Sequence, residues 1–420
     1  MSAAHCPEAS TLAHMRPRVL RWYRAKRRDL PWRRTRDPYR IWVSEIMLQQ
    51  TRVDVVVPYY EAFVQRFPNV QTLAAARLDS ILRAWSGLGY YRRARHMHAA
   101  AKRIVERHGG RLPRDVDAVR ALPGIGDYTA GAICSIAFGK PAPILDGNVV
   151  RVLARWFGIA EDVDSRAVRN RLWEWAAHWA RTRSPGDANQ ALMELGATLC
   201  TKTAPACSAC PVREHCNAFA TGRTQDLPRP RKRPDAVRVQ AVALLVRRAD
   251  ALLLVRRRSG RLLQDWWEAP TQRAPHPQRA APPTAARLQR WADTMQARLG
   301  MEVERLRAVG MTRHGILANR IELEVVTAAW KRHAPGTKRA KTPPARPGPS
   351  VAGATPLVNL ELADLEVRWV EPDACRGLPL STLTRKALRT AASTDSSWSE
   401  YLDQDIREQR PDQGRAQPTQ

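Results

Sequence analysis

Four cysteines close together near the middle of the chain constrain its fold more than any other feature. Cys200, Cys207, Cys210 and Cys216 have six, two and five residues between them. Thiolates at such short spacing surround one small inorganic core, and four of them suit a cubane 4Fe–4S cluster. Zinc is the alternative, but zinc ligands usually come as two close pairs separated by a longer stretch, so the compact spacing favours iron–sulfur. Because the protein supplies all four ligands, we expect a structural role for the cluster.

Composition indicates a polyanionic partner. The chain has 420 residues, enough for two folded domains, and a formal net charge of +29. Nucleic acid is the leading candidate for a partner, and the alternative is a gene whose base composition favours arginine codons. No apolar run is long enough to span a bilayer, and the first ten residues do not form a secretory signal. We therefore expect a cytoplasmic monomer whose cysteines do not form disulfides.

The first half of the chain has the pattern of consecutive helices. Apolar residues recur at spacings of three and four in Leu73–Trp85 and Arg92–Val105, and short Gly- and Pro-containing turns separate such runs. We predict a helical domain over residues 17–228, with its cysteine loop at 200–216, after a disordered N-terminus at 1–16. A basic, Pro-rich linker is predicted at 229–236.

Beyond the linker the apolar period changes, which predicts a separate α/β domain at residues 237–393. A helix is expected at Ala285–Leu299, and a Pro-, Gly- and Lys-rich disordered insertion at 333–354. The polar tail at 394–420 is also predicted to be disordered. The expected strands, of which the first two form a hairpin, are Val237–Val246, Ala251–Arg256, Ile321–Trp330 and Val367–Val370.

A short turn between two predicted helices has the features of a phosphate-binding site. It runs Leu122-Pro123-Gly124-Ile125-Gly126, and its two glycines permit a tight turn with close approach to the backbone. Free amides there and at the start of the next helix can point at an anion. This is the signature of a helix-hairpin-helix element that binds the DNA backbone through Leu122, Gly124 and Gly126. The alternative is an ordinary turn between helices.

Two carboxylates lie in apolar surroundings. Glu45 is the only charged residue of Trp42–Thr51, and Asp146 follows Ile144 and Leu145. Each could cap a helix or form a salt bridge. A carboxyl group buried among apolar side chains instead has a raised pKa, which suits a general acid at neutral pH.

These motifs together resemble the adenine DNA glycosylase (MutY) family of the endonuclease III, helix-hairpin-helix superfamily. The sequences WVSEIMLQQT at 42–51 and LDGN at 145–148 resemble the adenine-enzyme versions of two family motifs, and the cysteine spacing is that of the superfamily. The resemblance covers residues 21–216 strongly and 237–380 weakly. It implies an α+β protein, in which an all-α glycosylase domain with the cluster precedes an α/β Nudix-like domain.

The implied activity is base-excision repair of double-stranded DNA. The enzyme would hydrolyse the N-glycosidic bond of adenine mispaired with 8-oxoguanine or guanine. By resemblance, Glu45 is the proton donor to adenine N7, and Asp146 stabilises the cationic sugar. Asn148 would orient Asp146 or the water, and Tyr128 would line the base pocket. Such a pair suits the chemistry, because adenine leaves only when protonated and leaves behind an oxocarbenium-like cation.

Tyr128 separates this interpretation from its main rival. In the bifunctional branch of the superfamily a lysine at this position forms a Schiff base with the sugar, which tyrosine cannot do. A monofunctional enzyme is therefore expected. The rival, a bifunctional endonuclease III-like lyase, would be favoured by borohydride trapping of a covalent DNA adduct. A non-catalytic iron–sulfur DNA-binding protein is a further alternative.

Two loops are expected to open the duplex around the target base. By resemblance, Tyr90 matches an intercalating tyrosine, and Gln50, Thr51 and Leu88 match its neighbours at the opposite base. The alternative is that Leu88 and Tyr90 are packing residues at a helix junction. The resemblance also places three residues near the adenine pocket, namely Arg28, Trp32 and Gln190.

The second domain departs from its family in two ways. Residues 262–270 resemble the family's Nudix-like signature, but the predicted helix at 291–300 lacks the paired glutamates that bind magnesium, so no pyrophosphatase activity is expected. The Phe-Ser-His turn by which the family recognises 8-oxoguanine would fall on Ile316-Leu317-Ala318, where the Ser and His donors are missing. Adenine excision should be little affected by this difference.

Overall fold

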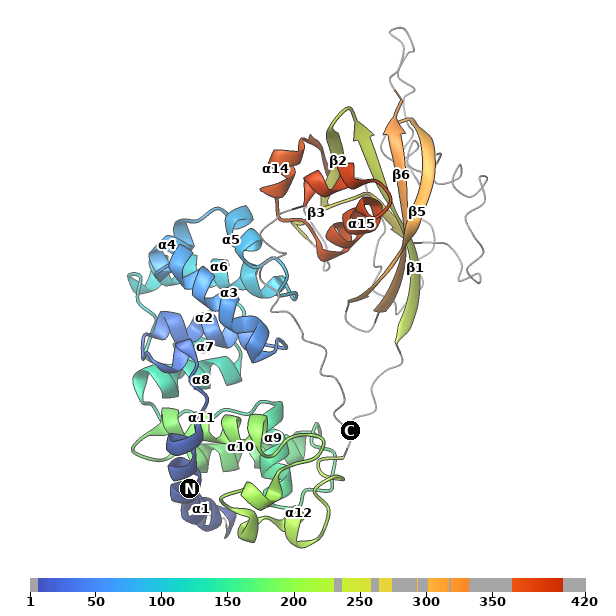
Figure 1. Cartoon of the computed structure of the whole chain (residues 1–420). Coiled ribbons are helices and arrows are strands. Elements are labelled where there is room, and N and C mark those ends of the chain that lie inside the picture. The colour runs from blue at the N-terminus through green and yellow to red at the C-terminus, as the bar shows by residue number, and fades with distance from the viewer. Residues whose placement is uncertain are drawn as a thin grey trace. The chain divides into compact units, whose positions relative to one another are not determined.

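The chain divides into two units, Met1–Arg233 and Pro234–Gln420 (Figure 1). A computed structural model describes residues 7–229, 236–257, 264–273, 293, 301–316, 319–331 and 365–402. Within these residues the first unit contains only helices, and the second is built on a β-sheet. The predicted α+β class, with a helical unit before an α/β unit, is therefore confirmed.

The first unit consists of short helices joined by tight turns. Polar side chains cap several of them; for example, Asp37 accepts hydrogen bonds from the amides of Tyr39 and Arg40. Two longer helices end at glycines in the left-handed conformation. The α-helices are α1 (Pro7–Lys26), α2 (Pro38–Leu48), α3 (Val53–Arg66), α4 (Val70–Ala75), α5 (Leu78–Ala84), α6 (Arg92–His108), α7 (Val116–Arg120), α8 (Asp127–Phe138), α9 (Gly147–Trp156), α10 (Arg166–Ala180), α11 (Pro185–Thr198) and α12 (Asn217–Ala220), with 3-10 turns η1 (Pro31–Arg33), η2 (Cys207–Ala209) and η3 (Arg213–His215).

Residues 7–16 differ from the predicted disorder, and residues 1–6 lie outside the described ranges. Helix α1 begins at Pro7 and packs against α10 and α11. Leu12, Met15, Val19 and Tyr23 recur at spacings of three and four, and all four are fully buried in the core. These four residues lie on one face of the helix, and their burial against distant helices stabilises it. The polar residues that separate them in the sequence are the reason that disorder was predicted.

The predicted helix Leu73–Trp85 is in fact two helices. Ala76 and Arg77 are extended, and they separate α4 from α5. The apolar pattern continues across this break because Leu73, Ile81 and Leu82 are buried on both sides of it. Periodicity alone could not show the interruption.

The helices of the first unit form two layers that meet at α8 and α11. One core contains side chains of α1 and of α8 to α12, and α8 also contacts α2 and α7. Helix α11 contacts both α8 and α9. The first turns of α8 and α9 therefore lie close to α2 and α11, and the residues predicted to be catalytic lie on these elements.

The second unit is a mixed sheet with helices against one face. The strand order is β3-β2-β1-β6-β5; β1 pairs with β2 in an antiparallel hairpin and with β6 in parallel, and β4 and β7 pair with β1 and β2. This confirms the predicted hairpin and the strands expected at Ile321–Trp330 and Val367–Val370. The strands are β1 (Val237–Arg248), β2 (Ala251–Arg257), β3 (Trp267–Glu268), β4 (Thr271–Arg273), β5 (Val303–Ile316), β6 (Asn319–Trp330) and β7 (Leu365–Val370).

Several elements of this unit were not predicted. Strand β5 is rich in charged residues and contains two register shifts, so its sequence does not alternate regularly. Helices α14 (Pro372–Arg376) and α15 (Thr382–Ala392) contribute to the core on one face of the sheet. The predicted disordered tail begins with the 3-10 turn η5 (Ser396–Tyr401), where Trp398 is buried with the guanidinium of Arg247 3.7 Å from its ring centroid.

Several predictions concern residues outside the described ranges. These are most of the linker, the helix at 285–299 except Asp293, the insertion at 333–354, the tip of the β5–β6 hairpin at 317–318 and the tail beyond 402. Among the described helices, none combines the length and the apolar character needed to cross a membrane.

Candidate active site

A buried glutamate and a tyrosine form the centre of the site. Glu45 lies on α2, only 5% exposed, and Tyr128 lies in the first turn of α8. The Tyr128 hydroxyl donates a hydrogen bond of 2.8 Å to Oε2 of Glu45. The packing of α2 on α8 thus brings together two residues that are 83 positions apart in the sequence.

The surroundings of Glu45 favour its protonated form. Burial is the main cause that raises the pKa of Glu45 to about 7, and the negative charge of Asp146 adds to it. The hydrogen bond from Tyr128 and the positive charge of Arg33 act in the opposite direction. Burial also raises the pKa of Tyr128 well above its ordinary value, so tyrosine remains the donor in this pair. Glu45 can therefore hold and release a proton near neutral pH.

Asp146 caps helix α9 and faces the same site. Its Oδ1 accepts a 2.8 Å hydrogen bond from the amide of Val149, and its Oδ2 accepts one of 2.9 Å from Nδ2 of Asn148. Burial raises the pKa of Asp146, while these hydrogen bonds lower it. Its charge raises the pKa values of both Glu45 and Tyr128, which indicates that the three side chains lie close together. An acid and an oriented carboxylate therefore share one site.

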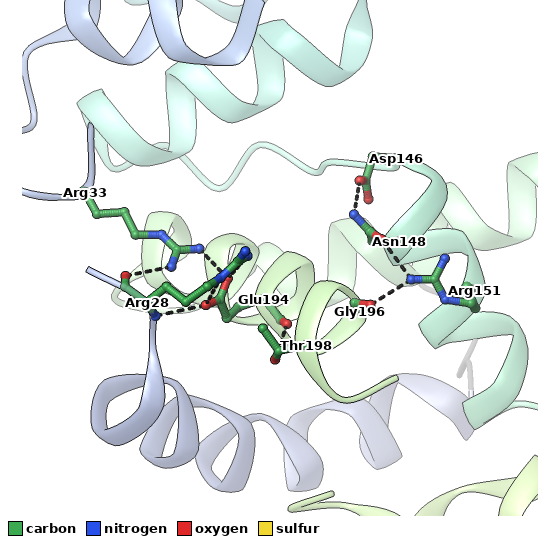
Figure 2. A network of polar contacts seen from close by, with 8 residues as sticks. All are labelled: Arg28, Arg33, Asp146, Asn148, Arg151, Glu194, Gly196 and Thr198. Atoms are coloured by element: carbon green, nitrogen blue, oxygen red, sulfur yellow. Dashed lines mark hydrogen bonds and ion pairs between the residues drawn. The ribbon is translucent and has the colours of Figure 1, made fainter. Parts of the chain in front are cut away.

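A chain of polar contacts runs from Asp146 through Asn148 to Arg151 (Figure 2), and Arg151 in turn contacts the cysteine loop. Nη2 of Arg151 donates to Oδ1 of Asn148 at 2.8 Å and to the Gly196 carbonyl at 2.7 Å. Nε of Arg151 donates to the carbonyl of Cys200 at 2.7 Å. The side chain that orients Asp146 is thus itself held by the segment that carries the first cysteine.

A second buried glutamate was missed by the sequence analysis. Glu194 on α11 is fully buried and accepts hydrogen bonds from the backbone amide and guanidinium of Arg28 and from Nη2 of Arg33 (Figure 2). Burial acts to raise its pKa, but the hydrogen bonds from both arginines prevail and lower it to about 2. A single acid within the apolar run Ala191–Gly196 is the signal that could have identified it, the same signal that identified Glu45.

The three residues predicted near the adenine pocket differ in their environment. Arg28 directs its guanidinium to Glu194. Trp32 is buried, and its ring packs edge-on against that of Tyr60 with centroids 5.3 Å apart. Gln190 is half-buried on α11. The structure thus gives Arg28 and Trp32 packing and ion-pair partners within the protein.

The predicted duplex-opening residues lie on two loops with unusual backbone. Gln50 and Tyr90 are exposed and have φ angles of 58° and 47°. Thr51 is half-buried beside Gln50. Leu88 is only 5% exposed and lies between the end of α5 and the start of α6. Of the four, Gln50 and Tyr90 have side chains exposed enough to meet a ligand.

The turn between α7 and α8 contains two glycines with different requirements. Gly124 has φ 76°, and a Cβ atom there would lie 2.5 Å from Cβ of His96, so the fold itself requires glycine. Gly126 has φ −99°, and a Cβ atom would meet nothing within 4 Å. Leu122 is buried beneath the turn. Glycine at 126 therefore leaves the backbone open from outside, next to the amides that begin α8.

The four clustered cysteines surround one small cavity. Cys200, Cys207, Cys210 and Cys216 all line a cavity of about 20 Å³, and all four are free thiols. Within the described ranges, no group of three or more His, Cys, Asp or Glu residues is arranged to hold a metal ion. Burial raises the pKa of Cys210 to about 11. The structure therefore brings the four thiols to one cavity, but it does not arrange them around a metal ion as they stand.

Part of the chain is similar in sequence to known DNA repair proteins. Residues 43–178 match the profile of the HhH-GPD superfamily of base excision DNA repair proteins. The chain is 42% identical over 255 residues to the adenine DNA glycosylase of Mus musculus, covering 59% of this chain and 49% of that one. It is 46% identical over 220 residues to the adenine DNA glycosylase of Homo sapiens, covering 50% and 40%. A solved thermostable thymine-DNA glycosylase is 30% identical, with a TM-score of 0.47, and covers 51% of this chain and 100% of its own.

The similarity is confined to part of each protein. The chain spans about half the length of the curated relatives it matches. The superfamily match contains Glu45, Tyr128 and Asp146, while the four cysteines lie beyond its end.

Proposed function

We propose that this chain, which belongs to the adenine DNA glycosylase family, hydrolyses the N-glycosidic bond of adenine mispaired with 8-oxoguanine or guanine in double-stranded DNA. The observation that carries the proposal is the site at which buried Glu45 receives the Tyr128 hydroxyl beside the capped carboxylate of Asp146. The net charge of +29 supports a polyanionic substrate.

Glu45 is proposed to protonate the adenine ring. Unprotonated adenine is a poor leaving group, and a general acid is most effective at protonating it when the pKa of the acid lies near the working pH. The pKa of Glu45, raised to about 7, meets this condition. Because Oε2 accepts from Tyr128, Oε1 is the oxygen proposed to carry the proton to the base.

Asp146 is proposed to stabilise the sugar as the bond breaks. The sugar becomes an oxocarbenium-like cation, and a fixed carboxylate stabilises such a charge without having to reorganise. The Val149 amide and Asn148 fix both oxygens of Asp146, and their hydrogen bonds act against the rise in its pKa that burial causes. Asn148 would also hold the attacking water.

The products distinguish this activity from that of a lyase. On a duplex with adenine opposite 8-oxoguanine, we expect free adenine and an abasic site that breaks only after alkali, because Tyr128 cannot form an imine with the sugar. Base chromatography and denaturing gels, with and without alkali, measure these products. Strand scission without alkali, or no released base, would contradict the proposal.

The cysteines are proposed to hold a 4Fe–4S cluster in a structural role. The cluster would fix the loop at 200–216, whose Cys200 carbonyl accepts from Arg151. We expect the purified protein to show the broad visible absorbance of sulfur-to-iron charge transfer, and Cys207→Ser to lose it. A colourless protein that contains zinc and no iron would sink this assignment.

The two glycines of the hairpin offer a matched test of DNA backbone binding. Gly126→Ala should keep the melting temperature within about 2 °C, since its Cβ meets no atom of the protein, yet weaken duplex binding about tenfold or more by blocking a phosphate. Gly124→Ala should instead lower the melting temperature, because of its positive φ and the contact with His96. Unchanged affinity of the Gly126 variant across salt concentrations would contradict this role.

A further inference from the structure

Each of the two loops that are proposed to open the duplex contains a residue with a strained backbone. Gln50 and Tyr90 both have positive φ, although neither is glycine. Such a conformation is strained for a residue with a side chain, and it persists only where the surrounding structure enforces it. Both residues are exposed, so the contacts that enforce these conformations must come from the buried side of the loops.

Arg93 makes those contacts. It lies in the first turn of α6 and is only 8% exposed. Its Nη2 joins the two loops directly, donating to Oγ1 of Thr51 at 3.0 Å and to the Gly89 carbonyl at 3.1 Å. Further bonds run from Nη1 to the carbonyls of Ile46, Met47 and Gln49, from Nη2 to that of Leu88, and from Nε to that of Tyr90.

The chemistry of these contacts requires a guanidinium group. The acceptors are neutral oxygens, several of them at the C-terminal end of α2, where a cation is favourable. The planar guanidinium of Arg93 has donors that reach both loops at once, which the single ammonium group of lysine cannot do. The guanidinium also lies 5.6 Å from the centroid of the Tyr90 ring and 5.4 Å from that of Trp85, so it supports the exposed tyrosine from below.

We propose that Arg93 is a positioning residue that fixes the loops at 49–51 and 88–90 as one rigid wedge for extruding the target base. The proposal rests on the function proposed above. A wedge held in its inserted geometry avoids ordering two separate loops during binding. Without Arg93 the strained residues relax, and the extruded population of the bound duplex falls.

Base extrusion can be measured apart from base release. The probe is a duplex with 2-aminopurine, a fluorescent adenine analogue whose emission rises on unstacking, opposite 8-oxoguanine. It is bound at saturation to the Glu45→Gln protein, which lacks the proton donor, and to Glu45→Gln/Arg93→Met. We expect the fluorescence increase to fall about tenfold with Arg93→Met, because the extruded fraction of the bound duplex falls. Arg92→Met, which removes an exposed charge on the same helix, should leave the increase unchanged.

Two further comparisons separate a loss of folding, and a failure of the proposed function, from a loss of base extrusion. If Arg93→Met does not melt cooperatively, Arg93→Lys decides the matter, because it keeps the charge but lacks the fork, and it should also reduce extrusion. An unchanged fluorescence increase in a folded variant would overturn the proposal. Extrusion by the Glu45→Gln protein with no adenine release by the unsubstituted protein would instead count against the proposed function and leave the wedge intact.

Discussion

Replacing Glu45 with Gln lowers the single-turnover rate constant for adenine release by about 10³-fold, while the affinity for the mispaired duplex stays within about threefold. Glutamine keeps the size of the side chain and can accept the Tyr128 hydrogen bond, but it has no proton to give to the base. Rapid quench with saturating enzyme measures the release, and gel shift measures the affinity. Equal loss of binding and release would show a structural effect instead.

The pH dependence of this variant tests the same assignment. Release by the unsubstituted protein should fall above pH 7, approaching about tenfold per pH unit, as Glu45 loses its proton, and the Gln variant should lack this limb. The pKa of Glu45 is raised in the folded state, so its contribution to stability is fully present below pH 4.5 and is lost as pH rises through 7. Glu45→Gln should thus melt like the unsubstituted protein at pH 4.5 and at a higher temperature at pH 8. The change in the pKa of Glu45 corresponds to a difference of about 3 kcal/mol in the free energy of unfolding at pH 8.

Replacing Asp146 with Asn should lower the rate constant for release by about 10³-fold as well. Asparagine is as good an N-cap as aspartate, so α9 should stay folded while the charge that stabilises the sugar cation is removed. Asp115→Asn is the matched control, because Asp115 caps α7 in the same way but lies outside the site. The same single-turnover assay measures all three proteins, with melting curves as the check on folding. A release rate for Asp146→Asn within tenfold of the unsubstituted protein would remove the carboxylate from the mechanism.

Local patterns predicted much of the fold, and contacts between distant segments explain what was missed. Helices and the β1–β2 hairpin follow from apolar spacing and turn residues, which act over a few positions. Helix α1 depends on burial against α10 and α11, more than 100 residues away, so its short apolar stripe looked insufficient. Trp398 likewise lies in a polar segment and is buried against a strand from the start of the unit.

In the candidate site too, local patterns identified some residues, while contacts between distant segments were missed. Glu45 and Asp146 were recognisable because each is an acid in an apolar run, and the structure shows that Asp146 is a helix cap whose charge acts on Glu45. The partners of Glu194 could not be predicted from the sequence. Glu194 receives its partners Arg28 and Arg33 from more than 160 positions away, and nothing local to α11 specifies them.

Selectivity among four duplexes tests the central claim most directly. Single-turnover release of adenine would be measured with adenine placed opposite 8-oxoguanine, guanine, cytosine and thymine. The account predicts release from the first two duplexes, and little or none from the duplexes with cytosine or thymine. No release opposite 8-oxoguanine and guanine, from protein that binds the same duplexes, would contradict it.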